Sequence, residues 1–253
     1  MRTITPIAYF RSPFTSKFGI PRQSGLVEEL RGRIVFEPPY RREEALKGIE
    51  EFDYLWIIWG FSANNCGGNP SNTLTVRPPR LGGNERIGVF ASRSPFRPNG
   101  LGLSSVRFSR IVDGEIEVMG ADLMDGTPIY DIKPYIAYAD SHPKARGGFT
   151  DSKEWQELKV VIDERLKDGF SPEELQAMQK VLALDPRPHY HHDANRIYGM
   201  PFAGRDIRFR VADGVLTVTG VSGLSGNSGR SGKSGITGEI GSPGTTTSNK
   251  ETT

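Results

Sequence analysis

Several features are scarce or missing in this sequence, and each absence excludes a class of protein. The single cysteine, Cys66, rules out an intramolecular disulfide and any cysteine-ligated iron–sulfur or zinc site. The longest apolar stretch, Leu55 to Phe61, is too short to cross a bilayer. The first residues contain neither a long apolar run nor a small-residue cleavage site, so we expect no signal peptide. The cytoplasm is therefore the expected location.

A strong charge of one sign is also missing from the chain as a whole. The formal net charge is only +2, with 32 Lys and Arg against 30 Asp and Glu. The length of 253 residues and the hydrophobic fraction of 36% fit a soluble globular protein with one large domain, or one medium and one small domain. Basic character must then be local, which favours a specific anion or nucleic-acid site over a generally cationic surface.

Common nucleotide-binding and nucleophile motifs are absent as well. The chain has no GxGxxG and no GxxxxGK[ST] pattern, which disfavours a dinucleotide fold and a P-loop. Its serines lack a GxSxG setting. The run from His189 to Asp193 matches no standard metal-ligand spacing. We interpret that run as an exposed loop, with metal binding as the minor alternative, and we expect no metal.

The arginines that are present gather between Val76 and Arg110. This segment holds seven Arg, no Lys and one acid, Glu85, with Pro and Gly between them. Arginine binds a carboxylate or phosphate through two parallel hydrogen bonds and stacks on flat rings. Proline and glycine fix and bend the backbone that carries the arginines. The composition predicts a rigid binding segment for an anionic or flat ligand, and a basic surface loop is the alternative.

The first part of the chain predicts a mainly β fold. Short segments rich in Ile, Val, Phe, Tyr or Trp are bounded by Gly, Pro, Asn or Asp. The predicted strands are Ile4 to Phe10, Arg33 to Glu37, Tyr54 to Phe61, Arg86 to Ala91, Ser104 to Ile111, Glu115 to Leu123 and Ile129 to Ile132. Asp113-Gly114 predicts a hairpin turn, and Arg41 to Ile49 predicts a helix. Many short strands with few helices favour a closed barrel over a parallel sheet covered by helices.

A small α+β unit is expected after the barrel, because the composition shifts to His, Pro, Gly and Lys over 141–153. Ser171-Pro172-Glu173-Glu174 predicts a capped helix start. Strands are predicted at Leu158 to Ile162, Asp206 to Val211 and Val215 to Val221, the last two joined by a turn at Asp213-Gly214. We therefore expect a barrel domain over 1–145, a C-terminal domain over 146–221 and a tail over 222–253.

The tail repeats Gly at every third position from Gly220 to Gly244. This is the collagen period, but Pro243 is the only proline in it, and a stable triple helix needs many. We interpret the tail as a disordered Gly/Ser-rich segment, with a weak trimerising stalk as the alternative.

Two pairs of residues have both a structural and a functional interpretation. Trp56 and Trp59 lie in a predicted strand, where we expect them to pack in the core; stacking on a base is the alternative. Asp122 and Asp125 belong to a tight turn leaving a strand. They are either turn residues or acceptors of hydrogen bonds from an amine or ribose.

A set of motifs in the first 140 residues resembles the TsaA-like β-barrel methyltransferases. The motifs are FRSP at Phe10, PRQSG at Pro21, YLWII at Tyr54, VRPPRLGGN at Val76, GVFASRSPFRPN at Gly88 and DGTPIYDIKPY at Asp125. The second unit, with Asp185-Pro186-Arg187-Pro188, is similar to that of longer bacterial members. The resemblance implies a closed barrel that binds S-adenosylmethionine, works as a homodimer and methylates the N6 amine of threonylcarbamoyladenosine next to the tRNA anticodon, at adenosine 37.

The resemblance also implies which residues form the site. Cofactor-binding residues would be Pro21, Arg22, Gln23, Ser62, Ala63, Arg93, Leu103, Asp125, Gly126, Thr127 and Pro128. Asp122 or Asp125 would direct and accept the proton of the amine. Phosphates and bases of the tRNA would meet Arg77, Arg80, Arg97 and Arg187. Many members have His-Gln where this chain has Ser62-Ala63, which leaves a non-catalytic cofactor- and RNA-binding module open as an alternative. A methyltransferase for another adenine derivative is the third hypothesis.

Overall fold

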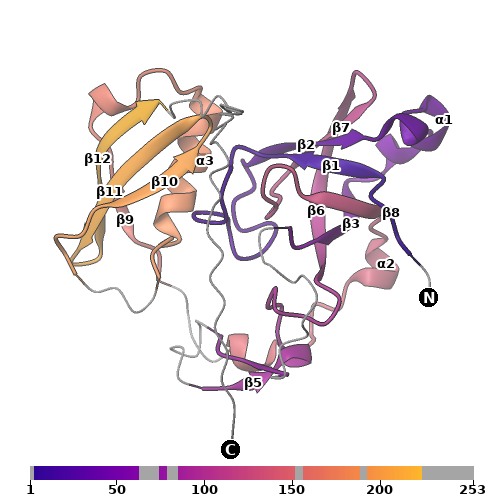
Figure 1. Cartoon of the computed structure of the whole chain (residues 1–253), viewed down its shortest axis with the longest axis horizontal. Coiled ribbons are helices and arrows are strands. Elements are labelled where there is room, and N and C mark those ends of the chain that lie inside the picture. The colour runs from indigo at the N-terminus through magenta and orange to yellow at the C-terminus, as the bar shows by residue number, and fades with distance from the viewer. Residues whose placement is uncertain (1–2, 63–73, 79–84, 152–155, 189–192, 224–253) are drawn as a thin grey trace, which may run out of the picture.

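The computed structural model describes residues 3–62, 74–78, 85–151, 156–188 and 193–223. The first part of the chain forms a closed barrel of antiparallel strands (Figure 1). In pairing order around the barrel, these are β1 (Ala8–Arg11), β2 (Arg31–Phe36), β7 (Glu115–Met119), β6 (Leu101–Val112), β3 (Tyr54–Gly60) and β8 (Pro128–Pro134). β1 closes the barrel by pairing with β2 on one side and β8 on the other. The mainly β fold and the closed barrel expected from the sequence are confirmed.

Alternate side chains along the strands fill the barrel interior. Those less than 2% exposed include Phe10, Ile34, Leu55, Ile57, Ile116, Val118 and Ile129. Gly32 of β2 faces the same interior, where the ring of Phe10 occupies the space that a Cβ would need. The interior is therefore a packed apolar core, and any site must lie at an end of the barrel or on its surface.

The connection from β2 to β3 is helical but contains little α-helix. It consists of η1 (Pro38–Tyr40), α1 (Glu43–Leu46) and η2 (Ile49–Glu51). The predicted helix over Arg41 to Ile49 is thus reduced to one α-helical turn. Gly48 takes a left-handed conformation, with φ 85°, just after the turn and ends it.

Both predicted Asp-Gly hairpin turns are confirmed. Asp113 and Gly114 have φ values of 52° and 76°, and Asp213 and Gly214 have values of 49° and 73°. Two positive φ angles in succession form the turn whose twist matches antiparallel strands, and Asp followed by Gly tolerates them best. One turn joins β6 to β7, and the other joins β11 to β12.

The second unit is a four-stranded sheet with a helix against it (Figure 1). The strand order is β10 (Tyr198–Phe202), β11 (Arg205–Ala212), β12 (Val215–Gly223) and β9 (Lys159–Val161), with β9 parallel to β12. The helix α3 (Pro172–Ala183) begins with the expected capping box between Ser171 and Glu174. Three short elements lie between β8 and α3: α2 (Ala137–Asp140), η5 (Gly148–Asp151) and η6 (Glu164–Leu166). Of these, α2 lies beside the barrel (Figure 1).

Some strands differ from the predictions. The strand predicted over Arg86 to Ala91 is present only as β5 (Ile87–Gly88), which pairs with β4 (Thr75–Val76). Its second half is wrong, because the chain turns there into η4 (Val89–Ala91). The hydroxyl of Ser92 donates to the Val89 carbonyl and closes that turn. β10 was not predicted, and it contains Pro201, a residue that is rare inside strands. It is an edge strand, where proline is tolerated. The tail predicted over 222–253 begins two residues too early, because β12 continues to Gly223. Residues 224–253 lie outside the described part.

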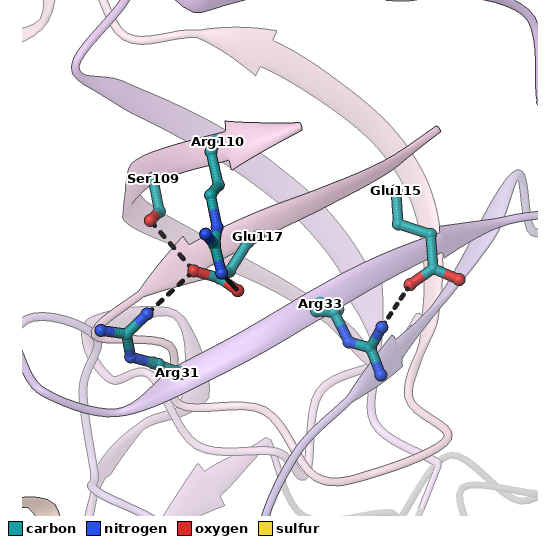
Figure 2. A network of polar contacts seen from close by, with 6 residues as sticks. All are labelled: Arg31, Arg33, Ser109, Arg110, Glu115 and Glu117. Carbon is teal, nitrogen blue, oxygen red and sulfur yellow. Dashed lines mark hydrogen bonds and ion pairs between the residues drawn. The ribbon is translucent and has the colours of Figure 1, made fainter. Parts of the chain in front are cut away.

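A polar cluster on the outside of the barrel joins three of its strands (Figure 2). Glu117 of β7 accepts hydrogen bonds from Arg31 of β2 at 3.1 Å, from Ser109 of β6 at 3.1 Å and from Arg110 at 3.2 Å. A register shift between Phe108 and Arg110 allows the consecutive residues Ser109 and Arg110 to reach the same carboxylate. Burial acts to raise the pKa of Glu117, but these hydrogen bonds and the charges of Arg110 and Arg31 outweigh it and hold the pKa below its usual value.

We expect Glu117→Ala to lower the free energy of unfolding at pH 7 by about 1–3 kcal/mol, because two arginines lose their shared acceptor. Glu115→Ala is the matched control, since Glu115 meets one half-exposed arginine, Arg33, and should contribute less than about 1 kcal/mol. A lowered folded pKa stabilises the folded state above the unfolded pKa, and this stabilisation is lost as the pH falls through the folded value. Denaturant unfolding from pH 7 down to about 3 should therefore show the Glu117→Ala difference shrinking. A difference that stays constant over this range would contradict the assignment.

Candidate functional site

Three long connections leave the described barrel at one end, which we call the barrel mouth. They are 12–30 between β1 and β2, 61–100 between β3 and β6, and 120–127 between β7 and β8. The strands are antiparallel throughout, so successive connections alternate between the two ends of the barrel. Main-chain hydrogen bonds tie the connections together, with the amide of Gly25 donating to the Gly120 carbonyl at 2.8 Å. Nearly all the site residues implied by the resemblance lie on these connections or on the strand ends beside them.

Arg93 and Gln23 join two of the connections. The Arg93 guanidinium donates to Oε1 of Gln23 at 2.5 Å, although the residues are 70 positions apart in sequence. Arg93 is exposed and Gln23 is half-buried, so the cation remains accessible from solvent. Pro21 is buried and Arg22 exposed in the same 12–30 connection. The structure therefore brings together two of the cofactor residues that the resemblance implies, Gln23 and Arg93.

Asp122 lies at the end of a hydrogen-bonded relay that starts inside the barrel. The indole N–H of Trp59 donates to Oγ of Ser104 at 3.0 Å, and the Ser104 hydroxyl donates to Oδ1 of Asp122 at 2.6 Å. Burial raises the pKa of the Asp122 carboxyl above its usual value. The Ser104 hydrogen bond, the charge of Arg93 and the main-chain N–H of Ser24 oppose that effect only in part. A fixed carboxylate with a raised pKa beside a cation is typical of a group that takes up a proton.

Asp125 has a different environment, although it is only three residues away. Its Oδ1 accepts the main-chain N–H of Ser12 at 3.1 Å, and its Oδ2 is 3.6 Å from the Arg11 guanidinium. The amide of Gly126 donates to the Phe10 carbonyl, which fastens the turn onto β1. Gly126 has φ 74°, a conformation that glycine adopts most readily. Asp125 therefore holds the shape of the turn that continues through Thr127 to Pro128.

The other expected cofactor residues are placed as follows. Ser62 is exposed and follows Phe61, whose amide donates to the Gly100 carbonyl at the start of β6. Leu103 is 57% exposed and points away from the barrel, opposite to the neighbouring Ser104. Ala63 lies outside the described residues. Ser62 and Leu103 therefore flank the mouth on the outer side of paired strands.

Of the four arginines expected to meet nucleic acid, two bind within the protein. Arg97 donates to the carbonyls of Ser92 at 2.6 Å and Val89 at 3.4 Å, which braces η4. Arg187 donates through Nε and Nη2 to both oxygens of Asp185 at 2.8 Å. Arg77 is exposed just after β4, and Arg80 lies outside the described residues. Arg77 is thus the described member of this set whose exposure best suits contact with a phosphate.

Sequence reasoning missed Ser104 and misplaced one tryptophan. Ser104 is 2% exposed on an inward strand position, and a polar residue at such a position was the signal that could have identified it. Trp59 packs in the core as predicted. Trp56 does not, because residues three apart in a strand face opposite sides. Its indole N–H instead donates to Asp140 at 2.9 Å on the outside of the barrel.

Neither a metal site nor a membrane-spanning helix is found among the described residues. No group of three or more His, Cys, Asp or Glu side chains that could hold a metal ion is found among them. The run His189 to His192 and Cys66 lie outside that part of the chain. Within the same residues, no helix is both long and apolar enough to span a membrane.

Comparison with known proteins places this geometry in a family. The model of the tRNA-methyltransferase O N-terminal domain matches residues 9–141, and that of the TrmO C-terminal domain matches residues 156–224. The chain belongs to the TrmO family. The resemblance seen in the motifs is thereby confirmed.

Relatives and solved structures of this family match most of the chain. A tRNA (adenine(37)-N6)-methyltransferase from Escherichia coli is 39% identical over 220 residues, covering 82% of this chain and 92% of that protein. A putative S-adenosylmethionine-dependent methyltransferase, RcsF, from Pseudomonas aeruginosa is 38% identical over 214 residues, covering 82% of this chain and 91% of that protein. A crystal structure of TrmO from P. aeruginosa superposes with a TM-score of 0.71 at 31% identity and covers 88% of this chain and 100% of that one.

The effect of the Ser104 hydrogen bond on the pKa of Asp122 can be tested on the protein without substrate. Because the Ser104 hydroxyl stabilises the ionised carboxylate, Ser104→Ala should raise the pKa of Asp122 further. Carboxyl-resolved NMR titration measures this shift directly. Ser105→Ala is the matched control, since Ser105 is the next residue on β6 and faces the other side. A lower or unchanged Asp122 pKa in Ser104→Ala would show that the hydroxyl does not support the carboxylate.

Proposed function

We propose that this chain transfers a methyl group from S-adenosylmethionine to N6 of threonylcarbamoyladenosine at position 37 of tRNA. The observation that carries the proposal is the arrangement at the barrel mouth, where Asp122 with its raised pKa lies in the field of Arg93, itself bonded to Gln23. Membership of the TrmO family and the names of its E. coli and P. aeruginosa members support the reaction class.

The residues present fit the proposed cofactor chemically. Its carboxylate matches the guanidinium of Arg93, which has donors beyond the one used on Gln23. When bound, S-adenosylmethionine supplies an electrophilic methyl group on a sulfonium. Main-chain groups on the 12–30 and 120–127 connections are fixed by hydrogen bonds to each other and to β1, so the pocket can be formed before a ligand arrives. The exposed Ser62 and Leu103 are the proposed outer contacts.

The protein's part in the transfer is positioning and removal of a proton. N6 is a weak nucleophile, because its lone pair is delocalised into the ring and the carbamoyl group. A carboxylate that accepts its N–H strengthens the nucleophile and fixes its direction. With the cofactor bound, Asp122 would take up the N–H proton as the nitrogen displaces the sulfur from the methyl carbon. The relay from Trp59 through Ser104 keeps the carboxylate oriented for that step.

The homodimer implied by the resemblance remains part of this proposal. Large apolar side chains are exposed on and beside the 61–100 connection: Leu74, Phe90, Phe96 and Leu103. Exposed apolar side chains of this size are ones that a partner subunit could cover. Sedimentation velocity of the full chain tests this, and a monomer at all concentrations would refute it.

Arg93→Ala should weaken binding of S-adenosylmethionine by about 1.5–3 kcal/mol, since one charge-assisted hydrogen bond to the carboxylate is lost. Isothermal titration on the folded variant measures the change. Arg97→Ala is not a suitable comparison, because Arg97 braces the same loop. Arg86→Ala is the matched control, since the Arg86 guanidinium donates to the Thr75 hydroxyl of β4 at 3.4 Å. Equal affinity of Arg93→Ala and wild type would remove Arg93 from the cofactor site.

Substrate choice separates the proposed reaction from its alternatives. A site that binds the threonylcarbamoyl carboxylate through charge-assisted hydrogen bonds loses them with plain adenosine, a mismatch that discriminates by about 10⁴-fold or more. We expect methyl transfer to tRNA that carries threonylcarbamoyladenosine and almost none to an unmodified transcript of the same sequence, measured by mass analysis of the nucleosides. Equal rates on both would indicate a general adenine methyltransferase. No transfer to either, with cofactor bound, would indicate a non-catalytic module.

A further inference from the structure

The 12–30 connection belongs to two parts of the molecule at once. Its middle carries the proposed cofactor residues Pro21 to Gln23 and the Ser24 amide that faces Asp122. Its apolar side chains lie in the core of the second unit. Phe14, Val27 and Leu30 are 1%, 1% and 3% exposed within the same cluster as β10, β11 and α3, and Phe18 and Ile20 pack against it. In Figure 1 this connection runs between the barrel and the second unit.

Specific contacts fix the first half of the connection to β10 and β11. The ring of Phe14 meets that of Phe202 edge-on at 5.4 Å, and Phe18 stacks on Phe209 at 6.5 Å. Gly19 has φ 91°, and a Cβ there would collide with the side chain of Met200. Only two residues separate Gly19 from Arg22, so Met200 supports the backbone directly before the proposed cofactor residues.

Hydrogen bonds and an ion pair fix the two ends. The amide of Ala203, just after β10, donates to the Pro13 carbonyl at 3.0 Å. At the other end, Glu29 accepts hydrogen bonds from two α3 side chains, Gln176 at 3.2 Å and Lys180. The hydrogen bond and charge of Lys180 outweigh burial and hold the pKa of Glu29 below its usual value, so this tie is ionic at neutral pH.

We propose that the second unit positions the cofactor-binding connection, and that Met200 is a positioning residue for the methyl transfer. This inference rests on the proposed function, because it takes Pro21 to Gln23 as cofactor contacts. The connection is hydrogen-bonded to the barrel side through Ser12, Phe14, Gly25 and Leu30, but its buried apolar side chains pack in the core of the second unit. Its shape therefore depends on the second unit as well as on the barrel. Cofactor binding and the order of the second unit are then thermodynamically linked, and each must stabilise the other.

The first test compares two core truncations of the second unit in the full chain. Met200→Ala removes a fully buried side chain against Gly19, and Leu216→Ala removes one on β12, which β11 separates from β10. We expect Met200→Ala to raise the dissociation constant and KM for S-adenosylmethionine at least ~5-fold with kcat nearly unchanged, while Leu216→Ala changes them less than ~2-fold at a similar loss of stability. Met200→Leu, which restores the bulk, should restore affinity. Equal effects of both truncations, or none, would overturn the proposal.

The second test needs no variant. Hydrogen exchange of the wild-type chain with and without S-adenosylmethionine should show slower exchange of β10 and β11 amides in the bound state, although neither strand carries a proposed cofactor contact. Protection confined to the barrel would contradict the linkage. If the wild type binds no cofactor at all, the proposed function fails instead, so the two failures are distinguishable.

Discussion

The antiparallel closure of the barrel is the constraint on which the rest of the structure depends. Because every neighbouring pair of barrel strands is antiparallel, alternate connections must emerge at the same end. The other end carries α1 in the β2–β3 connection and the Asp113-Gly114 turn between β6 and β7. The connections 12–30, 61–100 and 120–127 therefore emerge at the mouth, although they are far apart in the sequence. A row of hydrogen-bonded side chains runs from the packed interior to that mouth, from Trp59 through Ser104 to Asp122.

The arginines of the chain fall into two groups according to the partners that they have within the protein. Arg97, Arg187 and Arg110 donate to partners within the protein, to carbonyls or carboxylates, and so stabilise loops and strands. Arg93 bonds to a neutral amide oxygen and keeps its positive charge uncompensated by that partner. The positive charge of Arg93 at the mouth can therefore attract an anionic ligand. Composition alone does not show which arginines have partners within the protein, so it could not distinguish a binding segment from a basic loop.

How much could be predicted from the sequence depended on whether the deciding signal was local. The Asp-Gly turns and the Ser171 capping box need only neighbouring residues, and both were predicted correctly. Trp56 was wrongly expected in the core together with Trp59, because side chains three positions apart in a strand point to opposite faces. The Ser104–Asp122 bond needs the register of β6 beside the end of β7, which no local pattern specifies. The sharing of the 12–30 connection between two cores is likewise a tertiary property, visible only once α3 and β10 are in place.

Replacement of Asp122 by Asn tests the central claim, that the mouth performs proton removal during methyl transfer, most directly. Asn keeps the shape and the contact with Ser104 but cannot take up the proton. With cofactor and modified tRNA saturating, kcat should fall by about 10²–10⁴-fold while cofactor affinity changes little. Asp125→Asn, three residues away on the same turn, should lose stability yet keep most of its kcat, because Ser12 and Arg11 hold that carboxylate. An Asp122→Asn enzyme that turns over at the wild-type rate would contradict this account.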